Sequence, residues 1–117
     1  MIFVIDDDEI MRECILRACG RDFETRGFSN AVVAMEAIAD GVVPDLVFLD
    51  ILLDGPDGFT LLNEMMSYTD TARVPIVVVT SLDLGGRDLS AYGVVGVLSK
   101  DTMRPEEVRE YVAKYAK

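Results

Sequence analysis

The chain has 117 residues, half of them hydrophobic, and a formal net charge of -10. This length predicts one domain, residues 1–117, whose core is large enough to be stable without disulfides or structural metals. The acidic balance argues against direct binding to nucleic acid or to an anionic membrane surface. A basic partner or a bound cation is easier to reconcile with it.

Several classes of protein are disfavoured by what the sequence lacks. No apolar run approaches the roughly 20 residues of a membrane span, and the first residues lack the basic flank of a signal peptide, so we expect a cytoplasmic protein. The sequence has no histidine, which removes Ser-His-Asp and Cys-His nucleophile systems and a phosphohistidine in this chain. Cys14 and Cys19 lie on different faces of a predicted helix, which indicates two reduced thiols.

Short apolar runs alternate with amphipathic segments along the chain. The runs predict five strands, at residues 2–5, 23–28, 46–49, 76–79 and 94–98. Helices are expected after an N-cap at Asp7 or Asp8, from Asn30 to a stop at Gly41, after a cap at Asp57, and from Pro105 onward.

Two of these segments carry more detailed expectations. The inner face of the helix after Asp57 is predicted to consist of four apolar residues, namely Phe59, Leu62, Met65 and Met66. The fourth crossover, residues 81–93, contains Gly85 and Gly86. Because glycine disfavours helix, at most a short or irregular fourth helix is expected there, from about Arg87 to Tyr92.

This alternation predicts an α/β fold, a doubly wound parallel sheet with helices on both faces. Ligands of such sheets bind beyond the carboxyl ends of the strands. The polar residues at those ends are Asp6, Asp7, Asp50, Thr80, Ser81 and Lys100. Each of these residues could simply cap a helix or be a solvated residue at the end of a strand. For the nearby acidic residues Asp8, Asp54 and Asp57, this simpler interpretation is the better one.

Together the strand-end residues carry the groups that phosphoryl transfer requires. Carboxylates from Asp6, Asp7 and Asp50 suit a hard cation such as Mg²⁺, because that ion prefers oxygen ligands. Thr80 offers a hydroxyl donor and Lys100 a fixed positive charge. With no histidine available, a carboxylate is the natural nucleophile, and Asp50 on the central strand is the best placed.

The ordered segments "VIDDDE", "DLVFLDILLDGPDGF", "VPIVVVTS" and "VLSK" resemble a CheY-like response-regulator receiver domain over essentially the whole chain. The resemblance implies a flavodoxin-like, five-stranded sheet in the order 2-1-3-4-5. It implies that Asp50 is the phospho-acceptor and that Mg²⁺ or Mn²⁺ is held by Asp6, Asp7, Asp50 and the backbone carbonyl of Leu52. Thr80 then matches the hydroxyl that follows the phosphoryl group, and Lys100 the lysine that pairs with it.

The resemblance also implies a function in two-component signalling. A histidine kinase or phosphotransfer protein would donate the phosphoryl group, and the resulting conformational change would regulate an output partner or effector domain. The domain would catalyse only its own phosphorylation and dephosphorylation, and a homodimer is compatible with this role. The resemblance adds neither nucleic acid nor membrane binding to this domain.

Two departures from the family pattern leave an alternative open. Val97 stands where the family often has an aromatic switch residue, and the fourth crossover is rich in glycine and slightly short. A degenerate receiver that acts as a constitutive protein-interaction module is therefore the runner-up. A further departure is Asp101, which follows Lys100 where proline is usual, so we expect a trans peptide bond there. A Mg²⁺-dependent hydrolase is a third reading, disfavoured because a haloacid-dehalogenase-type phosphatase would need an aspartate where Leu52 stands.

Overall fold

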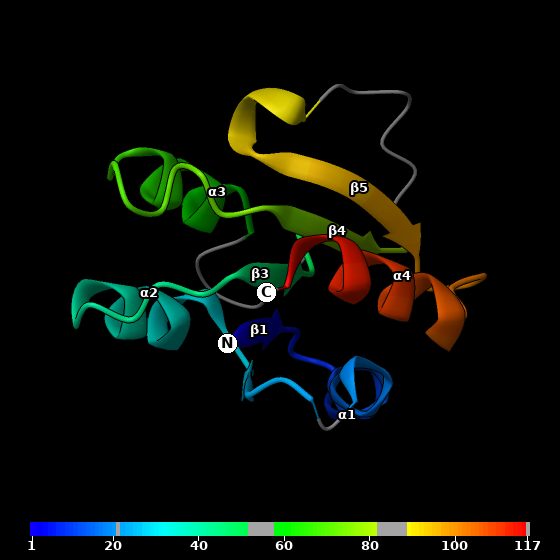
Figure 1. Cartoon of the computed structure of the whole chain (residues 1–117). Helices are drawn as coiled ribbons and strands as arrows, with labels where there is room; N and C mark the ends of the chain where they lie inside the picture. Colours follow the sequence, from blue (N-terminus) through cyan, green and yellow to red (C-terminus); the bar gives the residue numbers. More distant parts are fainter. Residues whose placement is uncertain (21, 52–57, 82–88, 117) are drawn as a thin grey trace.

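The strands form one parallel sheet in the computed structural model, which describes residues 1–20, 22–51, 58–81 and 89–116 (Figure 1). Its order is β2-β1-β3-β4-β5, as the resemblance implies. The strands are β1 (Ile2–Ile5), β2 (Thr25–Phe28), β3 (Leu46–Leu49), β4 (Ile76–Thr80) and β5 (Val94–Ser99). The apolar runs therefore identify every strand of this sheet, although β2 begins at Thr25, two residues later than predicted.

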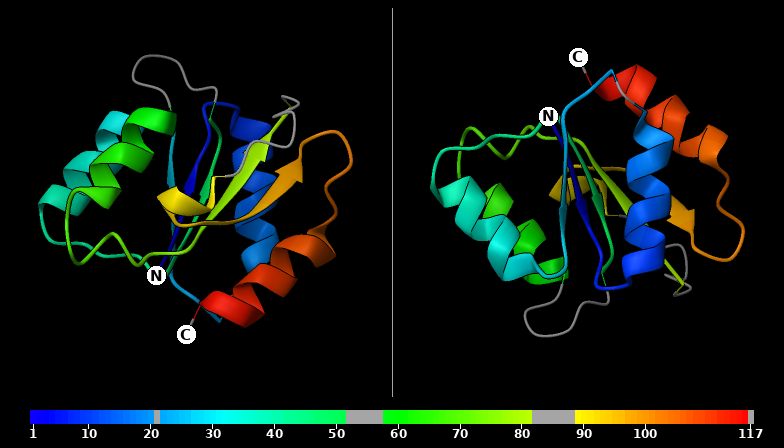
Figure 2. Two further views of the ribbon diagram at one scale, coloured as in Figure 1. Left: turned by 90° about the horizontal axis from the view of Figure 1, so that it is seen from above. Right: turned by 90° about the horizontal axis from the view of Figure 1, so that it is seen from below.

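Helices cover both faces of the sheet (Figure 2). They are α1 (Glu9–Cys19), α2 (Ala31–Ala39), α3 (Gly58–Met66) and α4 (Pro105–Tyr115), with a 3₁₀ turn, η1 (Ser90–Tyr92), before β5. The α2 and α3 side chains pack on one face, against Phe3, Val47 and Leu49, while α1 and α4 pack on the other. Among the described residues, no helix has both the length and the apolar character needed to cross a bilayer.

The helix starts follow the polar caps in the sequence. Asp8, not Asp7, caps α1, and its Oδ1 accepts hydrogen bonds from the N–H groups of Ile10 and Met11 at 3.0 and 3.2 Å. Asn30 caps α2 in the same way, through the N–H of Val33 at 3.0 Å. These bonds satisfy helix N–H groups that otherwise lack partners. Because Asp8 is used in this way, Asp7 is left available for another role.

The inner face of α3 differs from the prediction. Leu61, Leu62 and Met65 are buried, whereas Met66 is 39% exposed, so the assignment of Met66 to the inner face is wrong. Residues 61, 62 and 65 share one stripe of the helix, and Met66 lies one residue beyond it. The predicted cap at Asp57 falls outside the described residues.

The fourth crossover ends in a short irregular turn, as expected. Only η1, at Ser90–Tyr92, is helical among residues 89–93, and Gly93 follows with a φ of +80° that glycine adopts without strain. The earlier part of the predicted segment, including Arg87, lies outside the described residues. No cis peptide bond occurs in the described part of the chain, so the bond between Lys100 and Asp101 is trans as predicted.

Candidate functional site

The carboxyl ends of β1 and β3 bring Asp6 and Asp50 side by side. The two strands pair with Ile5 opposite Leu49, and each acidic residue directly follows its strand. The ladder continues past the strand ends, because the Asp50 N–H donates to the Ile5 carbonyl at 2.9 Å and the Asp6 N–H to the Phe28 carbonyl at 3.0 Å. Main-chain hydrogen bonds therefore fix both positions.

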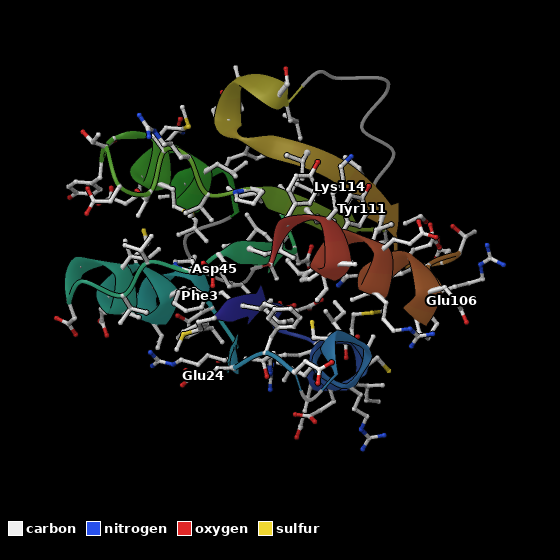
Figure 3. All side chains as sticks on the ribbon, in the orientation of Figure 1. Phe3, Glu24, Asp45, Glu106, Tyr111 and Lys114 are labelled. Carbon is white, nitrogen blue, oxygen red and sulfur yellow. The ribbon has the colours of Figure 1, made fainter. Side chains whose placement is uncertain are left out.

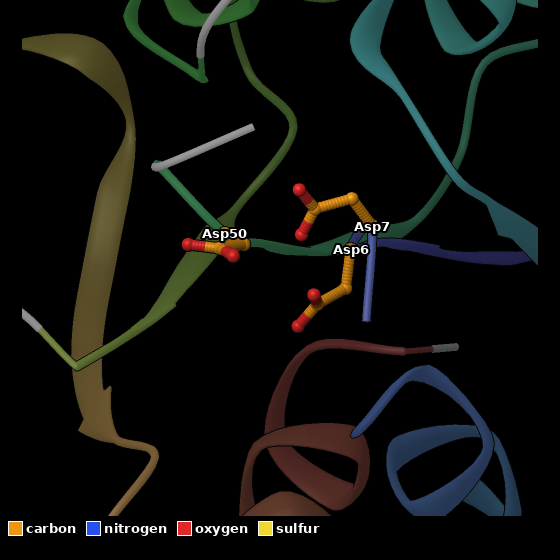
Figure 4. Close-up of side chains that lie close together, drawn as sticks. All are labelled: Asp6, Asp7 and Asp50. Atoms are coloured by element: carbon orange, nitrogen blue, oxygen red, sulfur yellow. The ribbon is translucent and has the colours of Figure 1, made fainter. Parts of the chain in front are cut away.

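Three carboxylates meet at this edge of the sheet (Figure 4). Asp6, Asp7 and Asp50 each offer an oxygen atom, and these atoms all lie within 4.8 Å of one another. Asp6 and Asp50 are buried, with 1% and 4% exposure, whereas Asp7 is exposed. The predicted acidic cluster is thus assembled, with one member open to solvent.

Lys100 joins the two buried carboxylates. Its Nζ donates to Asp50 Oδ2 at 2.8 Å and to Asp6 Oδ1 at 3.2 Å, and lies 3.1 Å from Asp6 Oδ2. Burial by itself lowers the pKa of Lys100, but the hydrogen bonds to Asp50 and Asp6 and the attraction of their negative charges together outweigh burial, so the pKa is raised. Lys100 therefore stays a cation, which is the charge its predicted role requires.

These contacts compensate only part of the negative charge on the buried Asp6 carboxylate. Burial raises its pKa, although the hydrogen bonds from the Asp8 N–H and from Lys100 act in the opposite direction. Its buried Oδ2 forms the ion pair with Lys100 at 3.1 Å but accepts no hydrogen bond of good geometry from the described residues. The cluster holds three carboxylates and one contacting ammonium group, that of Lys100, so its formal charge is -2. All of its possible metal ligands are oxygen atoms. This donor set fits a hard divalent cation such as Mg²⁺ or Mn²⁺.

Thr80 and Leu52 are the remaining residues predicted to belong to the site. Thr80 is buried at the carboxyl end of β4, and its carbonyl accepts the Lys100 N–H at 3.1 Å. Threonine and lysine thus sit at neighbouring strand ends, on the same edge of the sheet as Asp50. Leu52, whose carbonyl was expected to complete the cation site, lies outside the described residues.

Sequence reasoning missed one residue at this edge. Arg12, in the second turn of α1, reaches back so that its Nη1 donates to the main-chain carbonyl of Asp6 at 2.7 Å. The only signal for it was a basic residue one helical turn after the cap residue Asp8.

Comparison with known proteins agrees with this geometry. Residues 2–113 match the family described as the response regulator receiver domain. The chain belongs to this family. The receiver domain of NtrX from Brucella abortus is 28% identical, with a TM-score of 0.82 over 97% of this chain and 96% of that one. Response regulator PleD from Caulobacter vibrioides is 30% identical over 83 residues, or 70% of this chain.

A third comparison concerns the fold alone. The Mn(2+)-bound form of response regulator Rcp1 has a TM-score of 0.79 over 96% of this receiver domain and 91% of that chain, at 20% identity. The receiver domain spans only 18% of the length of PleD. Output activities of such longer relatives belong to parts of those proteins that this chain does not match.

Proposed function

We propose that this receiver domain is a phospho-acceptor switch in which Asp50 takes a phosphoryl group in a Mg²⁺-dependent reaction. The observation that carries the proposal is the contact of Lys100 with both buried carboxylates, 2.8 Å from Asp50 Oδ2, beside an acidic cluster suited to a divalent cation. The strand-end residues supply the groups that phosphoryl transfer needs, namely a carboxylate nucleophile, oxygen ligands for a cation, a hydroxyl donor and a fixed positive charge.

The chemical step is a displacement at phosphorus. An Asp50 carboxylate oxygen forms a bond to phosphorus while the bond from phosphorus to the donor's imidazole nitrogen breaks, and the imidazole leaves with that electron pair. Membership of the receiver family supports a phosphohistidine on a histidine kinase or phosphotransfer protein as the donor. The donor is a separate protein, since this chain has no histidine of its own. The result is an aspartyl phosphate, and no oxidant or reductant is involved.

The chain's own residues have distinct parts in this scheme. Asp6, Asp7 and Asp50, with the Leu52 carbonyl, would hold Mg²⁺ or Mn²⁺, which when bound neutralises charge that develops on the phosphoryl oxygens. Lys100 supplies a second fixed positive charge next to Asp50. The Thr80 hydroxyl donates a hydrogen bond to a phosphoryl oxygen and so couples phosphorylation to the conformation of β4 and β5.

Intact-mass measurement with a small-molecule donor tests this function. Acetyl phosphate should add one phosphoryl group to the wild type in the presence of Mg²⁺ and far less after removal of the metal with EDTA. Asp50→Asn, which keeps the size of the side chain, should add none. Equal labelling of the wild type and Asp50→Asn would contradict the assignment of Asp50.

One observation favours the interaction-module alternative. Val97 is 48% exposed on β5, and it occupies the position where an aromatic residue often couples phosphorylation to the output surface. A receiver that stays folded, binds its partner and gains no phosphoryl group under any of these conditions would support a constitutive module instead.

A further inference from the structure

The loop that carries the acid pair is held by an arginine from α1. Arg12 Nη1 donates to the Asp6 carbonyl at 2.7 Å, and the Arg12 side chain is half-buried. A charged donor makes a stronger hydrogen bond than a neutral one. This bond is formed to the main chain, so it acts on the backbone that carries the carboxylates and not on the carboxylates themselves.

Gly27 on β2 makes room for this side chain. A Cβ atom at position 27 would lie 3.1 Å from Arg12 Cδ, 3.4 Å from Arg12 Cγ and 3.1 Å from Leu16 Cδ1. The alkyl stem of Arg12 therefore runs over a strand position that has no side chain of its own. Packing against Gly27 limits the conformations of the stem and directs the guanidinium toward Asp6.

The hydrogen bond to Asp6 determines the direction of the next residue. The Asp6 carbonyl belongs to the peptide unit that joins Asp6 to Asp7, and that unit is planar. Asp6 is also fixed by its N–H, which donates to Phe28, and by its Oδ1, which accepts the Asp8 N–H at 2.9 Å. With the carbonyl held by Arg12, the plane that sets the Asp7 Cα is fixed as well.

Asp7 depends on this support more than its neighbours do. Within the described part of the chain, no hydrogen bond to the Asp7 carboxylate is found, whereas Asp6 and Asp50 are held by Lys100. Asp7 is also the exposed member of the cluster. Its carboxylate is therefore aimed mainly by its own backbone, which Arg12 holds.

We propose that Arg12, seated over Gly27, is a positioning residue that aims Asp7 at the cation of the phospho-acceptor site. The inference rests on the proposed function, because it needs a cation to bind there. Loss of Arg12 should change the cation affinity in the direction opposite to that of a simple charge effect. Removing a positive charge near a cation site raises cation affinity by Coulomb's law, whereas loss of positioning lowers it.

Calorimetric titration of the receiver domain with Mg²⁺, in the absence of any phosphodonor, separates the two effects. Arg12→Gln should bind Mg²⁺ about tenfold more weakly than the wild type, as is typical when a group that orients a metal ligand is lost. Arg12→Lys should recover part of that loss because it keeps the charge and a donor. Arg17→Gln removes the same charge from the exposed side of α1 and should leave Mg²⁺ affinity close to that of the wild type.

Denaturant unfolding with and without Mg²⁺ distinguishes positioning from general stabilisation. A merely structural Arg12 would lower the free energy of unfolding equally in both conditions, whereas a positioning Arg12 also reduces the gain that Mg²⁺ provides. Unchanged or tighter Mg²⁺ binding by Arg12→Gln would overturn the inference. If that variant does not fold, Arg12→Met is the test variant, because it keeps an alkyl stem over Gly27 and removes the guanidinium that donates to Asp6. Unchanged Mg²⁺ affinity of that variant would overturn the inference.

The outcome also separates this inference from the proposed function. A wild type that binds Mg²⁺ and accepts a phosphoryl group, alongside an Arg12→Gln variant with wild-type affinity, would refute only the role of Arg12. A wild type that binds no Mg²⁺ would refute both.

Discussion

Asp7 and Asp8 are neighbours in the chain with different surroundings. Asp8 Oδ1 accepts two N–H groups at the start of α1, while the Asp7 carboxylate lies with Asp6 and Asp50 at the end of the sheet. The run of three acidic residues thus consists of an acid pair that belongs to the cluster and a third residue that belongs to the helix. Lys100 contacts Asp6 and Asp50 and so reduces repulsion within the cluster, and a bound divalent cation would reduce it further.

This division predicts different effects for matched substitutions. Asp7→Asn should weaken Mg²⁺ binding on the order of tenfold or more, because it removes a charged oxygen ligand, and should leave stability without Mg²⁺ unchanged or slightly higher. Asp8→Asn should retain wild-type Mg²⁺ affinity. Asp8→Ala should lower the free energy of unfolding by about 1 kcal/mol through loss of the cap. Similar losses of Mg²⁺ affinity from Asp7→Asn and Asp8→Asn, measured by calorimetry, would show that the division is wrong.

The two cysteines, like Asp7 and Asp8, have different surroundings. Both are free thiols, as predicted, with Cys14 exposed and Cys19 buried. Burial raises the pKa of Cys19 to about 12. The thiolate is the reactive form, so the Cys19 thiol stays protonated and unreactive at neutral and mildly alkaline pH.

Thiol labelling of the native protein should therefore modify one cysteine. At mildly alkaline pH, iodoacetamide is expected to react with Cys14, and reaction at Cys19 should require denaturant. Mass spectrometry of the labelled peptides checks this. Rapid modification of Cys19 in the native protein would mean that α1 does not pack against the sheet as described.

At the scale of elements, α4 and β5 meet through an unusual contact. The ring of Tyr111 occupies the space where a side chain at position 96 would lie, because residue 96 is glycine. In Figure 3, Tyr111 and Lys114 lie between the α4 ribbon and β5. The pairing of β4 with β5 shifts register near this point, between Ile76 and Val77. Gly96 thus allows the helix to approach the edge strand closely.

Gly96→Ala should destabilise the domain by about 1 to 3 kcal/mol, since the added methyl group overpacks this contact and forces the Tyr111 ring aside. In a protein that already carries Tyr111→Ala, Gly96→Ala should lower the free energy of unfolding much less. A double-mutant cycle from urea unfolding measures the coupling between the two sites. Equal costs in both backgrounds would contradict the packing of Tyr111 on Gly96.

Elements were predictable where periodicity and capping chemistry agree. The strands end in distinct polar residues, so the sequence alone places Asp6, Asp50, Thr80 and Lys100 at one edge of the sheet. The role of Arg12 could not be predicted, because a basic residue one turn after a helix cap does not by itself reveal a hydrogen bond to a main-chain carbonyl. The apolar periodicity of α3 fits more than one stripe of the helix, and only packing against the sheet selects Leu61 over Met66.

At the scale of the whole molecule, the parallel sheet is what creates the site. Residues 6, 50, 80 and 100 are far apart in sequence, yet all of them directly follow or end strands that point the same way. In a parallel sheet all such ends lie on one edge. The β2-β1-β3-β4-β5 order places β3, which carries Asp50, between the acid pair and the threonine and lysine.

The central claim is that Asp50 is the residue that accepts the phosphoryl group. Acyl phosphates are reduced by borohydride, so treatment of the protein with acetyl phosphate and Mg²⁺, followed by borohydride and peptide mapping, marks the modified carboxylate. We expect the Asp50 carboxylate to be reduced, dependent on Mg²⁺, with Asp6, Asp7 and Asp8 unmodified. Reduction at one of those three residues, or none at Asp50 in a folded protein that binds Mg²⁺, would contradict the claim.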